Sequence, residues 1–249
     1  MNLAQKTCLI TGGTKGIGAA TAITLAELGA NISLVARHLD DEAHRIQQQI
    51  EGLGRQCLLI AADVGKPAEA TRCVEETARQ FGSVDVLVHS AGGAVNGGLL
   101  ELTPETWLAA FDVHVHAIFH LCRAVIPGMR QKKEGAIILI SSAAGIRGIK
   151  TNIAYQTVKG ALPQMTRALA YEFAADNIRV NCVAPGVIRT AFHAQMTPDA
   201  RKHNLENRIP LRTEGTSEQV ASSIRELVTN DYITGQTLVI DGGLTMRIC

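Results

Sequence analysis

A tyrosine and a lysine one helical turn apart are the residues of this sequence best suited to proton transfer. They are Tyr155 and Lys159, in the stretch AYQTVKGAL at residues 154–162. A phenol with a reference pKa of about 10 carries protons poorly at neutral pH, so the pair needs a chemistry that would use it. Residues i and i+4 of a helix lie on one face, which would present both side chains to the same ligand.

A glycine-rich loop near the N-terminus could supply that chemistry. The stretch TGGTKGIG at 11–18 stands between an apolar strand and a helix. Gly12 permits a tight turn, Gly16 lets the backbone approach a pyrophosphate, and Gly18 allows close helix packing. The helix N-terminus then offers free N–H groups to an anion. This context favours a dinucleotide site over an ordinary glycine-rich turn.

The residues after the second expected strand indicate which dinucleotide would bind. NAD sites usually carry a carboxylate there, which bonds the ribose 2′-hydroxyl. This chain has Ala36 followed by Arg37, and Lys15 can approach the same position. Two cations without an acid suit a 2′-phosphate, so the sequence predicts NADP(H) rather than NAD(H), unless both are solvated surface charges. Asp63, after the third expected strand, can bond the adenine amino group, cap the next turn, or do both.

Short apolar runs that alternate with longer amphipathic stretches must position these residues. Runs that are apolar throughout are typical of strands buried on both faces, so the fold class is α/β. We expect one Rossmann-like domain over 1–249, a doubly wound sheet of about seven parallel strands with helices on both faces. The irregular stretch 187–215 is expected to be a substrate lid. The expected strands are 7–10, 31–36, 56–64, 84–92, 135–145, 178–186 and 236–243, and the expected helices are 16–30, 41–54, 67–81, 104–130 and 152–175.

The composition excludes several classes of function. The net charge of +1 gives no global field for nucleic acid or a membrane surface. Six scattered cysteines without a CxxC pair predict reduced, mostly buried thiols of a cytoplasmic protein. The N-terminal residues do not form a signal peptide pattern, and no run of 18 apolar residues predicts a transmembrane helix.

These motifs in this order resemble the short-chain dehydrogenase/reductase family, in the branch of 3-oxoacyl-acyl-carrier-protein reductases. The resemblance extends from Lys6 to about Gly243. It rests on TGxxxGxG, on Asp63, on a serine thirteen residues before the tyrosine, on YxxxK, and on APGVIRT at 184–190. Their combination is specific, although no single motif would suffice.

The resemblance implies a catalytic set. Ser142 would bond the substrate carbonyl oxygen, and Tyr155 would give that oxygen a proton or remove it. Lys159 would bind the nicotinamide ribose and lower the pKa of Tyr155, because a cation within about 4–6 Å favours the phenolate. The implied cofactor residues follow the strand ends and include the tyrosine and lysine: Gly12, Thr14, Lys15, Gly16, Ile17, Gly18, Arg37, Asp63, Val64, Ala91, Gly92, Tyr155, Lys159, Pro185, Gly186, Ile188 and Thr190.

The chain departs from the family pattern at two places. It has HSAG at 89–92 where relatives commonly have NNAG, and we expect His89 and Ser90 to be structural. His114 stands where relatives carry an asparagine that holds a water for proton transfer to the lysine. A histidine could carry out this relay and titrate near neutrality, or it could merely fill the kink of the helix.

Two further features of the helices invite comment. His116 and His120 are four residues apart, but no carboxylate completes a ligand set, so we expect core or interface histidines and no metal. Pro163 inside the catalytic helix removes the hydrogen bond to the Lys159 carbonyl and should produce a kink or admit a water.

The sequence thus predicts an NADP(H)-dependent enzyme that interconverts a ketone or aldehyde and an alcohol. The alternative is a reductase of 3-oxoacyl thioesters on acyl carrier protein, for which Arg130, Lys132 and Lys133 supply positive charge while Asp176 opposes it. A more remote alternative is a non-catalytic NADP sensor. The implied partners are a small carbonyl or alcohol substrate and further copies of the chain, in a homodimer or homotetramer formed by the helices at 104–130 and 152–175.

Overall fold

A single parallel sheet organises the molecule. The computed structural model describes residues 1–190 and 196–246. All pairings in the seven-stranded sheet are parallel, in the order β3-β2-β1-β4-β5-β6-β7, which confirms the expected fold class. The strands are β1 (Thr7–Thr11), β2 (Asn31–Ala36), β3 (Cys57–Ala61), β4 (Val86–His89), β5 (Gly135–Ile140), β6 (Ile178–Pro185) and β7 (Thr237–Ile240).

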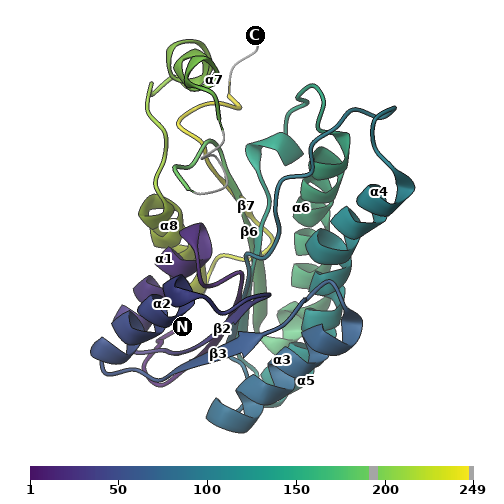
Figure 1. Cartoon of the computed structure of the whole chain (residues 1–249). Coiled ribbons are helices and arrows are strands. Elements are labelled where there is room, and N and C mark those ends of the chain that lie inside the picture. Colours follow the sequence, from purple (N-terminus) through teal and green to yellow (C-terminus); the bar gives the residue numbers. More distant parts are fainter. Residues whose placement is uncertain (191–195, 247–249) are drawn as a thin grey trace.

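Helices cover both faces of this sheet (Figure 1). One layer contains α1 (Gly16–Glu27), α2 (Asp41–Gly52) and α8 (Ser217–Thr229). The other contains α3 (Pro67–Phe81), α5 (Ala117–Lys132) and α6 (Ile153–Phe173). The shorter elements are α4 (Pro104–Phe111), α7 (Pro198–His203), the π-helical turns η1 (Asp112–His116) and η5 (Asn204–Arg208), and the 3₁₀ turns η2 (Ala143–Gly145) and η3 (Ala174–Asp176).

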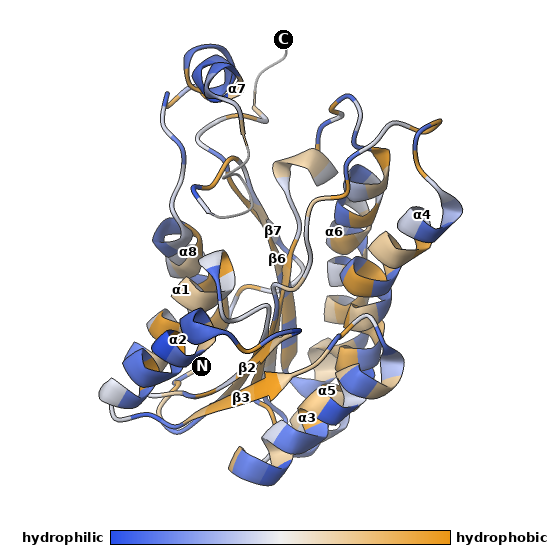
Figure 2. Ribbon diagram, viewed as in Figure 1, coloured by the Kyte–Doolittle hydropathy of each residue, from blue (hydrophilic) through white to orange (hydrophobic). Residues whose placement is uncertain are grey.

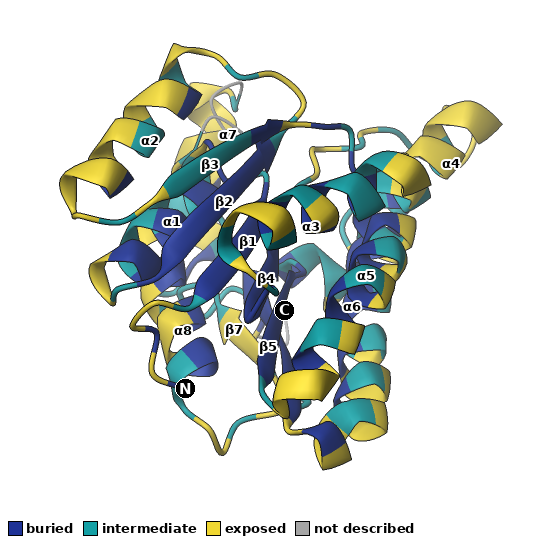
Figure 3. Cartoon of the chain, turned by 90° about the horizontal axis from the view of Figure 1, so that it is seen from below, coloured by how far each residue is buried: buried dark blue, intermediate teal, exposed yellow. Residues whose placement is uncertain are grey.

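Successive side chains along each strand point to opposite faces of the sheet, so the core has two halves. Leu9 packs under α3 and α5, whereas its neighbour Ile10 packs under α1 and α8. Each strand therefore contributes to both halves. The helix surfaces facing the sheet are apolar and those facing outward are polar (Figure 2), and the central strands are buried (Figure 3). This packing explains why the strands read as apolar throughout.

The long helix Pro104–Lys132, formed by α4, η1 and α5, belongs to this core. Its 29 residues contain an 18-residue window of mean hydropathy 1.3, so length and composition alone would allow it to cross a membrane. In the fold, the apolar side chains of α5 pack against the sheet and α3. The buried residues are Ala117, Ile118, Leu121, Cys122, Val125, Ile126 and Met129. This burial is typical of a core helix.

The helix α8 was not expected from the sequence. A capping box starts it: the Thr216 hydroxyl accepts from the Gln219 N–H, and the Gln219 side chain accepts from the Thr216 N–H. The expected irregular stretch 187–215 likewise contains two short helical elements, α7 and η5. Their polar residues gave no clear apolar period, so the hydrophobic pattern alone did not reveal them.

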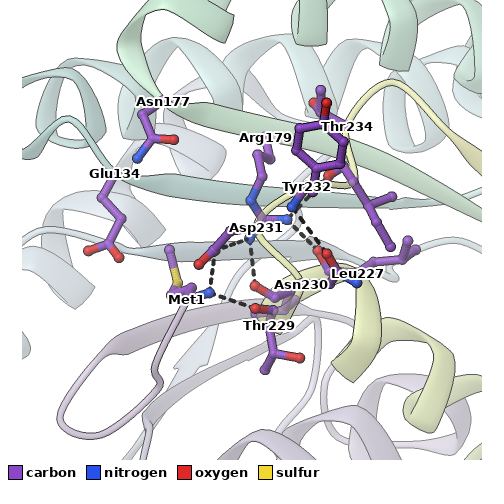
Figure 4. Close-up of polar contacts among 12 residues, drawn as sticks. Met1, Glu134, Asn177, Arg179, Leu227, Thr229, Asn230, Asp231, Tyr232 and Thr234 are labelled. Atoms are coloured by element: carbon purple, nitrogen blue, oxygen red, sulfur yellow. Dashed lines mark hydrogen bonds and ion pairs between the residues drawn. The ribbon is translucent and has the colours of Figure 1, made fainter.

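Arg179 of β6 holds the end of α8 (Figure 4). Its guanidinium donates to the carbonyls of Leu227 and Val228, both at 2.6 Å, and lies 3.7 Å from the carboxylate of Asp231. The last carbonyls of a helix lack intrahelical donors, and the arginine supplies them. Burial lowers the pKa of Arg179. The contacts attach α8 to β6 on the face of the sheet that α1 also covers.

The helix α6, which carries Tyr155 and Lys159, continues through Pro163, where we expected a kink or a water. Because proline has no N–H, the carbonyl of Lys159 lacks its helical donor. The hydroxyl of Ser141, just after β5, donates to this carbonyl at 2.7 Å. A side chain therefore satisfies the oxygen that the proline leaves unpaired.

Candidate active site

The candidate site lies at the carboxyl ends of the strands, where the strand order reverses between β1 and β4. Gly12 follows β1 and Ala91 follows β4, and a Cβ on Gly12 would meet the Ala91 nitrogen at 2.8 Å. Crevices at such switch points bind ligands in open α/β sheets. A cavity of about 1660 Å³ occupies this position.

This cavity brings together nearly all of the catalytic and cofactor residues expected from the sequence. The exception is Gly18, which packs inside the loop, where a Cβ would meet the Gly12 oxygen at 2.1 Å. The lining residues among those expected are Gly12, Thr14, Lys15, Gly16, Ile17, Arg37, Asp63, Val64, Ala91, Gly92, His114, Ser142, Tyr155, Lys159, Pro185, Gly186, Ile188 and Thr190.

The hydroxyl groups of Ser142 and Tyr155 are close to each other in the cavity, and the Ser142 hydroxyl favours ionisation of the phenol. Ser142 stands between β5 and η2, and its oxygen also accepts from the N–H of Ala144 at 3.1 Å. This acceptor role leaves the hydroxyl proton of Ser142 available for the tyrosine. The end of β5 and the first turn of α6 thus present two hydroxyls to one point of the cavity.

Lys159 lies one turn further along α6 and is nearly inaccessible, with 7% exposure. Its Nζ donates to the carbonyl of Ile140 at 2.7 Å and lies 5.7 Å from the centre of the Tyr155 ring. Burial lowers the pKa of Lys159 to about 8. The expected shared face of Tyr155 and Lys159 is therefore present, and the ammonium is anchored to the strand.

The expected lowering of the Tyr155 pKa was wrong for this state of the protein. Burial raises the pKa of Tyr155, and the hydrogen bond from Ser142 opposes the rise. The loss of hydration penalises the phenolate, and Lys159, whose ammonium bonds the Ile140 carbonyl, is not among the neighbours that lower this pKa. Ser142, rather than Lys159, is the neighbour that favours ionisation.

His114 is buried in the π-helical turn η1, beside the tyrosine. The rings of His114 and Tyr155 meet edge to face with centres 5.9 Å apart. Nε2 donates to the Gly93 carbonyl at 3.1 Å, whereas Nδ1 has no hydrogen-bond partner within the described ranges 1–190 and 196–246. The ring occupies the space above Gly92, where a Cβ would lie 2.1 Å from Cε1. Inserted π-helical turns frequently occur at functional sites.

The expectation that His114 titrates near neutrality was wrong. Burial, together with the nearby charge of Lys159, lowers the pKa of His114 to about 3. The imidazole is therefore neutral at physiological pH. A neutral ring that donates through Nε2 and keeps Nδ1 as an acceptor can still pass a proton by exchanging tautomers.

Replacing His114 tests this neutral relay. We expect His114→Ala to lower kcat roughly tenfold, less than the ~100-fold loss typical of a direct proton donor. The pH–rate profile should keep its shape between pH 5 and 9, because a group with a pKa of about 3 does not titrate there. His114→Asn should restore part of kcat, and His116→Ala, at an exposed position, is the control. An unchanged kcat in His114→Ala would reduce the histidine to a packing residue.

The other unusual histidine has the structural role expected of it. His89 Nδ1 accepts from the Thr11 hydroxyl at 2.9 Å, and Nε2 donates to the Val113 carbonyl at 3.0 Å. Burial lowers the pKa of His89 to about 4, which keeps the ring neutral. The hydroxyl of Thr11 also accepts from the Ala91 N–H at 3.3 Å. This chain of bonds ties β1, β4 and η1 together beneath the cavity.

The glycine loop fits the phosphates of a dinucleotide. Within the described residues 1–190, α1 has neither a capping side chain at Lys15 nor an acidic residue in its first turn. By contrast, Asp40 caps α2 and Thr103 caps α4. The N–H groups of the first turn of a helix need acceptors, and α1 leaves them for an anion in the cavity.

The two cations expected to bind a 2′-phosphate, Lys15 and Arg37, have different surroundings. Lys15 pairs with Asp40 at 2.6 Å and with Glu42 at 3.5 Å, an arrangement that the sequence reasoning missed. These contacts raise the pKa of Lys15, chiefly through the hydrogen bond to Asp40. Arg37 is exposed and lines the cavity. The acidic run at the start of α2 is the sequence signal that could have revealed this competition for Lys15.

Asp63 has the capping role that was one of its two expected roles. Its Oδ1 accepts from the Gly65 N–H at 3.1 Å, which closes a turn after β3. Asp63 also lines the cavity next to Val64. The carboxylate therefore borders the cavity while it closes this turn.

Residues of the expected lid, 187–215, also line this cavity. Met196, Asn204, Asn207 and Arg208 line it, together with Thr245 of the C-terminal segment. Phe192, His193 and Gln195, expected to contribute to the lid, lie outside the described residues. Arg147, which follows η2, completes this side. The sequence reasoning missed Arg147 and Arg208 because neither stands in a recognised motif.

His116 and His120, which have the spacing of metal ligands, do not point to a common site. His116 bonds the Asp112 carboxylate at 2.9 Å, and His120 contacts the Phe119 ring with centres 5.2 Å apart. Within the part of the chain that the structure describes, no group of three or more histidine, cysteine or acidic side chains could hold a metal ion.

Comparison with known proteins places this geometry in a family. The family model described as enoyl-(acyl carrier protein) reductase matches residues 12–245. The 3-oxoacyl-acyl-carrier-protein reductase FabG of Thermotoga maritima is 35% identical over 99% of this chain and 100% of its own. A putative short-chain alcohol dehydrogenase from Sinorhizobium meliloti superposes with a TM-score of 0.94, at 31% identity and 99% coverage of both chains.

A second solved structure carries ligands. The L-sorbose reductase of Gluconobacter frateurii, in complex with NADPH and L-sorbose, superposes with a TM-score of 0.92 at 31% identity, with 100% coverage of both chains. With a family match across nearly the whole chain, and with the serine, tyrosine and lysine of the expected motif in one cavity, the chain belongs to the short-chain dehydrogenase/reductase family, in its FabG-like branch, and is an oxidoreductase.

Proposed function

We propose that the chain is an NADP(H)-dependent reductase that interconverts a ketone or aldehyde and an alcohol, with Tyr155 as general acid and base. The observation that carries the proposal is the meeting of Ser142, Tyr155 and the buried Lys159 in the cavity that the glycine loop also lines. A bound nicotinamide would supply the hydride.

Each side chain then has a distinct task. The two hydroxyls bind the carbonyl oxygen of the substrate, and the phenol of Tyr155 donates its proton as the oxygen gains negative charge. Lys159 holds the ribose and offers positive charge near the phenol. His114 passes protons toward Lys159 as a neutral ring. In the direction of oxidation, Tyr155 accepts the proton of the alcohol.

Arg37 and Lys15 support NADP(H) over NAD(H), as does the NADPH in the L-sorbose reductase structure. We expect Arg37→Ala to raise the Kd of NADPH at least about tenfold, since hydrogen bonds between charged groups contribute about 1.5–3 kcal/mol. The Kd of NADH should change less than threefold. Fluorescence titration of both cofactors measures this difference.

Asp40→Asn refines the same experiment. The amide keeps the cap of α2 but releases Lys15, so the Kd of NADPH should fall a few-fold while that of NADH stays constant. Asp41→Asn, at a neighbouring exposed carboxylate, is the control. Equal changes for NADPH and NADH in Arg37→Ala and Asp40→Asn would contradict the proposed preference.

Charge pairing at the helix ends favours a small substrate over an acyl carrier protein. Arg130 and Lys133 both pair with Asp176, at 2.8 and 2.6 Å, and Lys132 pairs with Asp85 at 2.7 Å. An acidic carrier protein would have to displace these carboxylates. Reduction of 3-oxoacyl thioesters remains the second candidate because FabG relatives match the full length of the chain.

The proposal includes a cytoplasmic oligomer. The five cysteines at described positions are free thiols, in keeping with a reducing compartment. Leu108 and Phe119 on the α4–α5 side are 58% and 50% exposed, and Tyr171 of α6 is 92% exposed. Such apolar side chains on the two long helices support a homodimer or homotetramer formed there.

A panel of ketones, aldehydes and alcohols, assayed with both cofactors, tests the activity. We expect NADPH oxidation with at least one uncharged or singly charged ketone, and a lower rate with 3-oxoacyl-acyl-carrier-protein. The proposed activity fails if NADPH binds and no member of the panel is turned over, which would favour the non-catalytic sensor.

A further inference from the structure

Two arginines give the substrate side of the cavity a positive charge. Arg147 and Arg208 line the cavity that also contains Ser142 and Tyr155. Neither arginine takes part in an ion pair among the described residues. The acidic side chains that line the same cavity are Asp63 and Asp112, and both lie at its other end, around Gly65.

Arg208 is positioned by a buried amide. Asn204, 5% exposed, begins the π-helical turn η5, and its Oδ1 accepts from Nη1 of Arg208 at 2.7 Å. Its Nδ2 lies 3.3 Å from the sulfur of Met196. Ile209, which follows Arg208 in the chain, is 3% exposed and packs against Gly242. Arg208 is therefore half-buried on an anchored backbone, with a neutral amide as its partner, although a partly desolvated guanidinium favours an anion.

Arg147 approaches from the opposite side of the C-terminal segment. Its Nε donates to the carbonyl of Thr245 at 2.9 Å, which leaves the two terminal nitrogens of the guanidinium for other partners. Gly243, two residues earlier, packs against Pro210 with a Cβ position 3.0 Å from that ring. The segment 242–245 thus lies between the Arg147 loop and the segment that carries Arg208.

We propose that the physiological substrate is an oxo acid, whose carboxylate is bound by Arg208 while Arg147 adds positive charge at the rim. This inference rests on the proposed function, because it places the carbonyl of the substrate at Ser142 and Tyr155. A planar guanidinium matches a carboxylate through two parallel hydrogen bonds. One oriented guanidinium and a second at the rim suit a single negative charge.

Matched pairs of substrates test the proposal. The probes are 3-oxobutanoate, 4-oxopentanoate and 5-oxohexanoate, each compared with its methyl ester, with NADPH as cofactor. We expect the wild type to prefer the acid at least tenfold in kcat/KM for one or more pairs. Arg208→Met should lower kcat/KM for that acid about 30- to 100-fold, mainly through KM, and for the ester less than threefold. Arg225→Met, at an exposed arginine of α8, should change neither value.

Three outcomes would overturn the proposal. One is a preference for the ester in every pair, and another is an equal loss for acid and ester in Arg208→Met. The third is a raised Kd of NADPH in Arg208→Met, which would assign the arginine to the cofactor. If no carbonyl compound is reduced at all, the proposed function fails on its own. Calorimetric binding of 4-oxopentanoate to the wild type and to Arg208→Met then still decides whether Arg208 binds a carboxylate.

Discussion

Replacing Tyr155 with phenylalanine is expected to lower kcat at least about a thousandfold, within the range of ~10²–10⁴ attributed to a positioned proton donor and the added loss of a hydrogen bond to the substrate oxygen. The phenol lies close to Ser142 in a buried position, and phenylalanine removes only its hydroxyl. Steady-state kinetics with the best ketone of the panel measures the loss.

The control for this variant is the integrity of the cofactor site. The Kd of NADPH in Tyr155→Phe should stay within about twofold of the wild-type value, because the glycine loop and Arg37 are unchanged. Tyr171→Phe, at a 92% exposed tyrosine of the same helix, should keep full activity. A Tyr155→Phe enzyme with near-normal kcat would refute the assignment of Tyr155 as general acid.

Replacing Lys159 with methionine is expected to separate activity from stability. Activity should fall at least about a hundredfold, since the variant loses the positive charge beside the phenol. The melting temperature at pH 7 should rise, because the folded protein holds this ammonium in a site where its pKa falls from 10.5 to about 8. Such a shift corresponds to a cost on the order of 3 kcal/mol, partly offset by the lost hydrogen bond to Ile140.

The pH dependence of this gain has a defined sign. Between pH 8 and 10.5 the unfolded wild-type chain binds more protons at Lys159 than the folded chain does, so wild-type stability from this residue increases with pH. The advantage of Lys159→Met should therefore be greatest below pH 8 and disappear by about pH 10.5. Thermal unfolding of both proteins across this range measures it. An advantage that grows with pH would contradict the burial of a cationic lysine.

The fold could be predicted well because the central strands are covered on both faces. Runs such as GAIILI of β5 are apolar throughout, and each predicted a buried parallel strand. The helix α8 escaped prediction because its sequence SEQVASSIRELVT mixes small and polar residues. Its capping box was the better signal, and it depends on two residues rather than on a hydrophobic period.

The parts of the candidate site that could be predicted are those in which the sequence separation of two residues determines whether they lie together. Tyr155 and Lys159 share a helix face by their separation alone, and the glycine loop must lie where β1 ends. The direction of the Tyr155 pKa shift was not predictable, because burial raises this pKa more than the neighbouring Ser142 lowers it, and only the three-dimensional structure gives that balance. The pairing of Lys15 with Asp40 was also hidden, since it joins two loops that follow different strands.

The proline in α6 restricts which substitutions the end of β5 can accept. Lys159 is attached to the end of β5 at two points, since its ammonium bonds Ile140 and its own carbonyl receives the hydroxyl of Ser141. The second attachment gives a donor to a carbonyl that Pro163, without an N–H, leaves unpaired. Ser141 and Pro163 are therefore coupled, because Ser141 supplies the donor that Pro163 lacks. We expect both residues to be kept, or both to be replaced, as the sequence evolves.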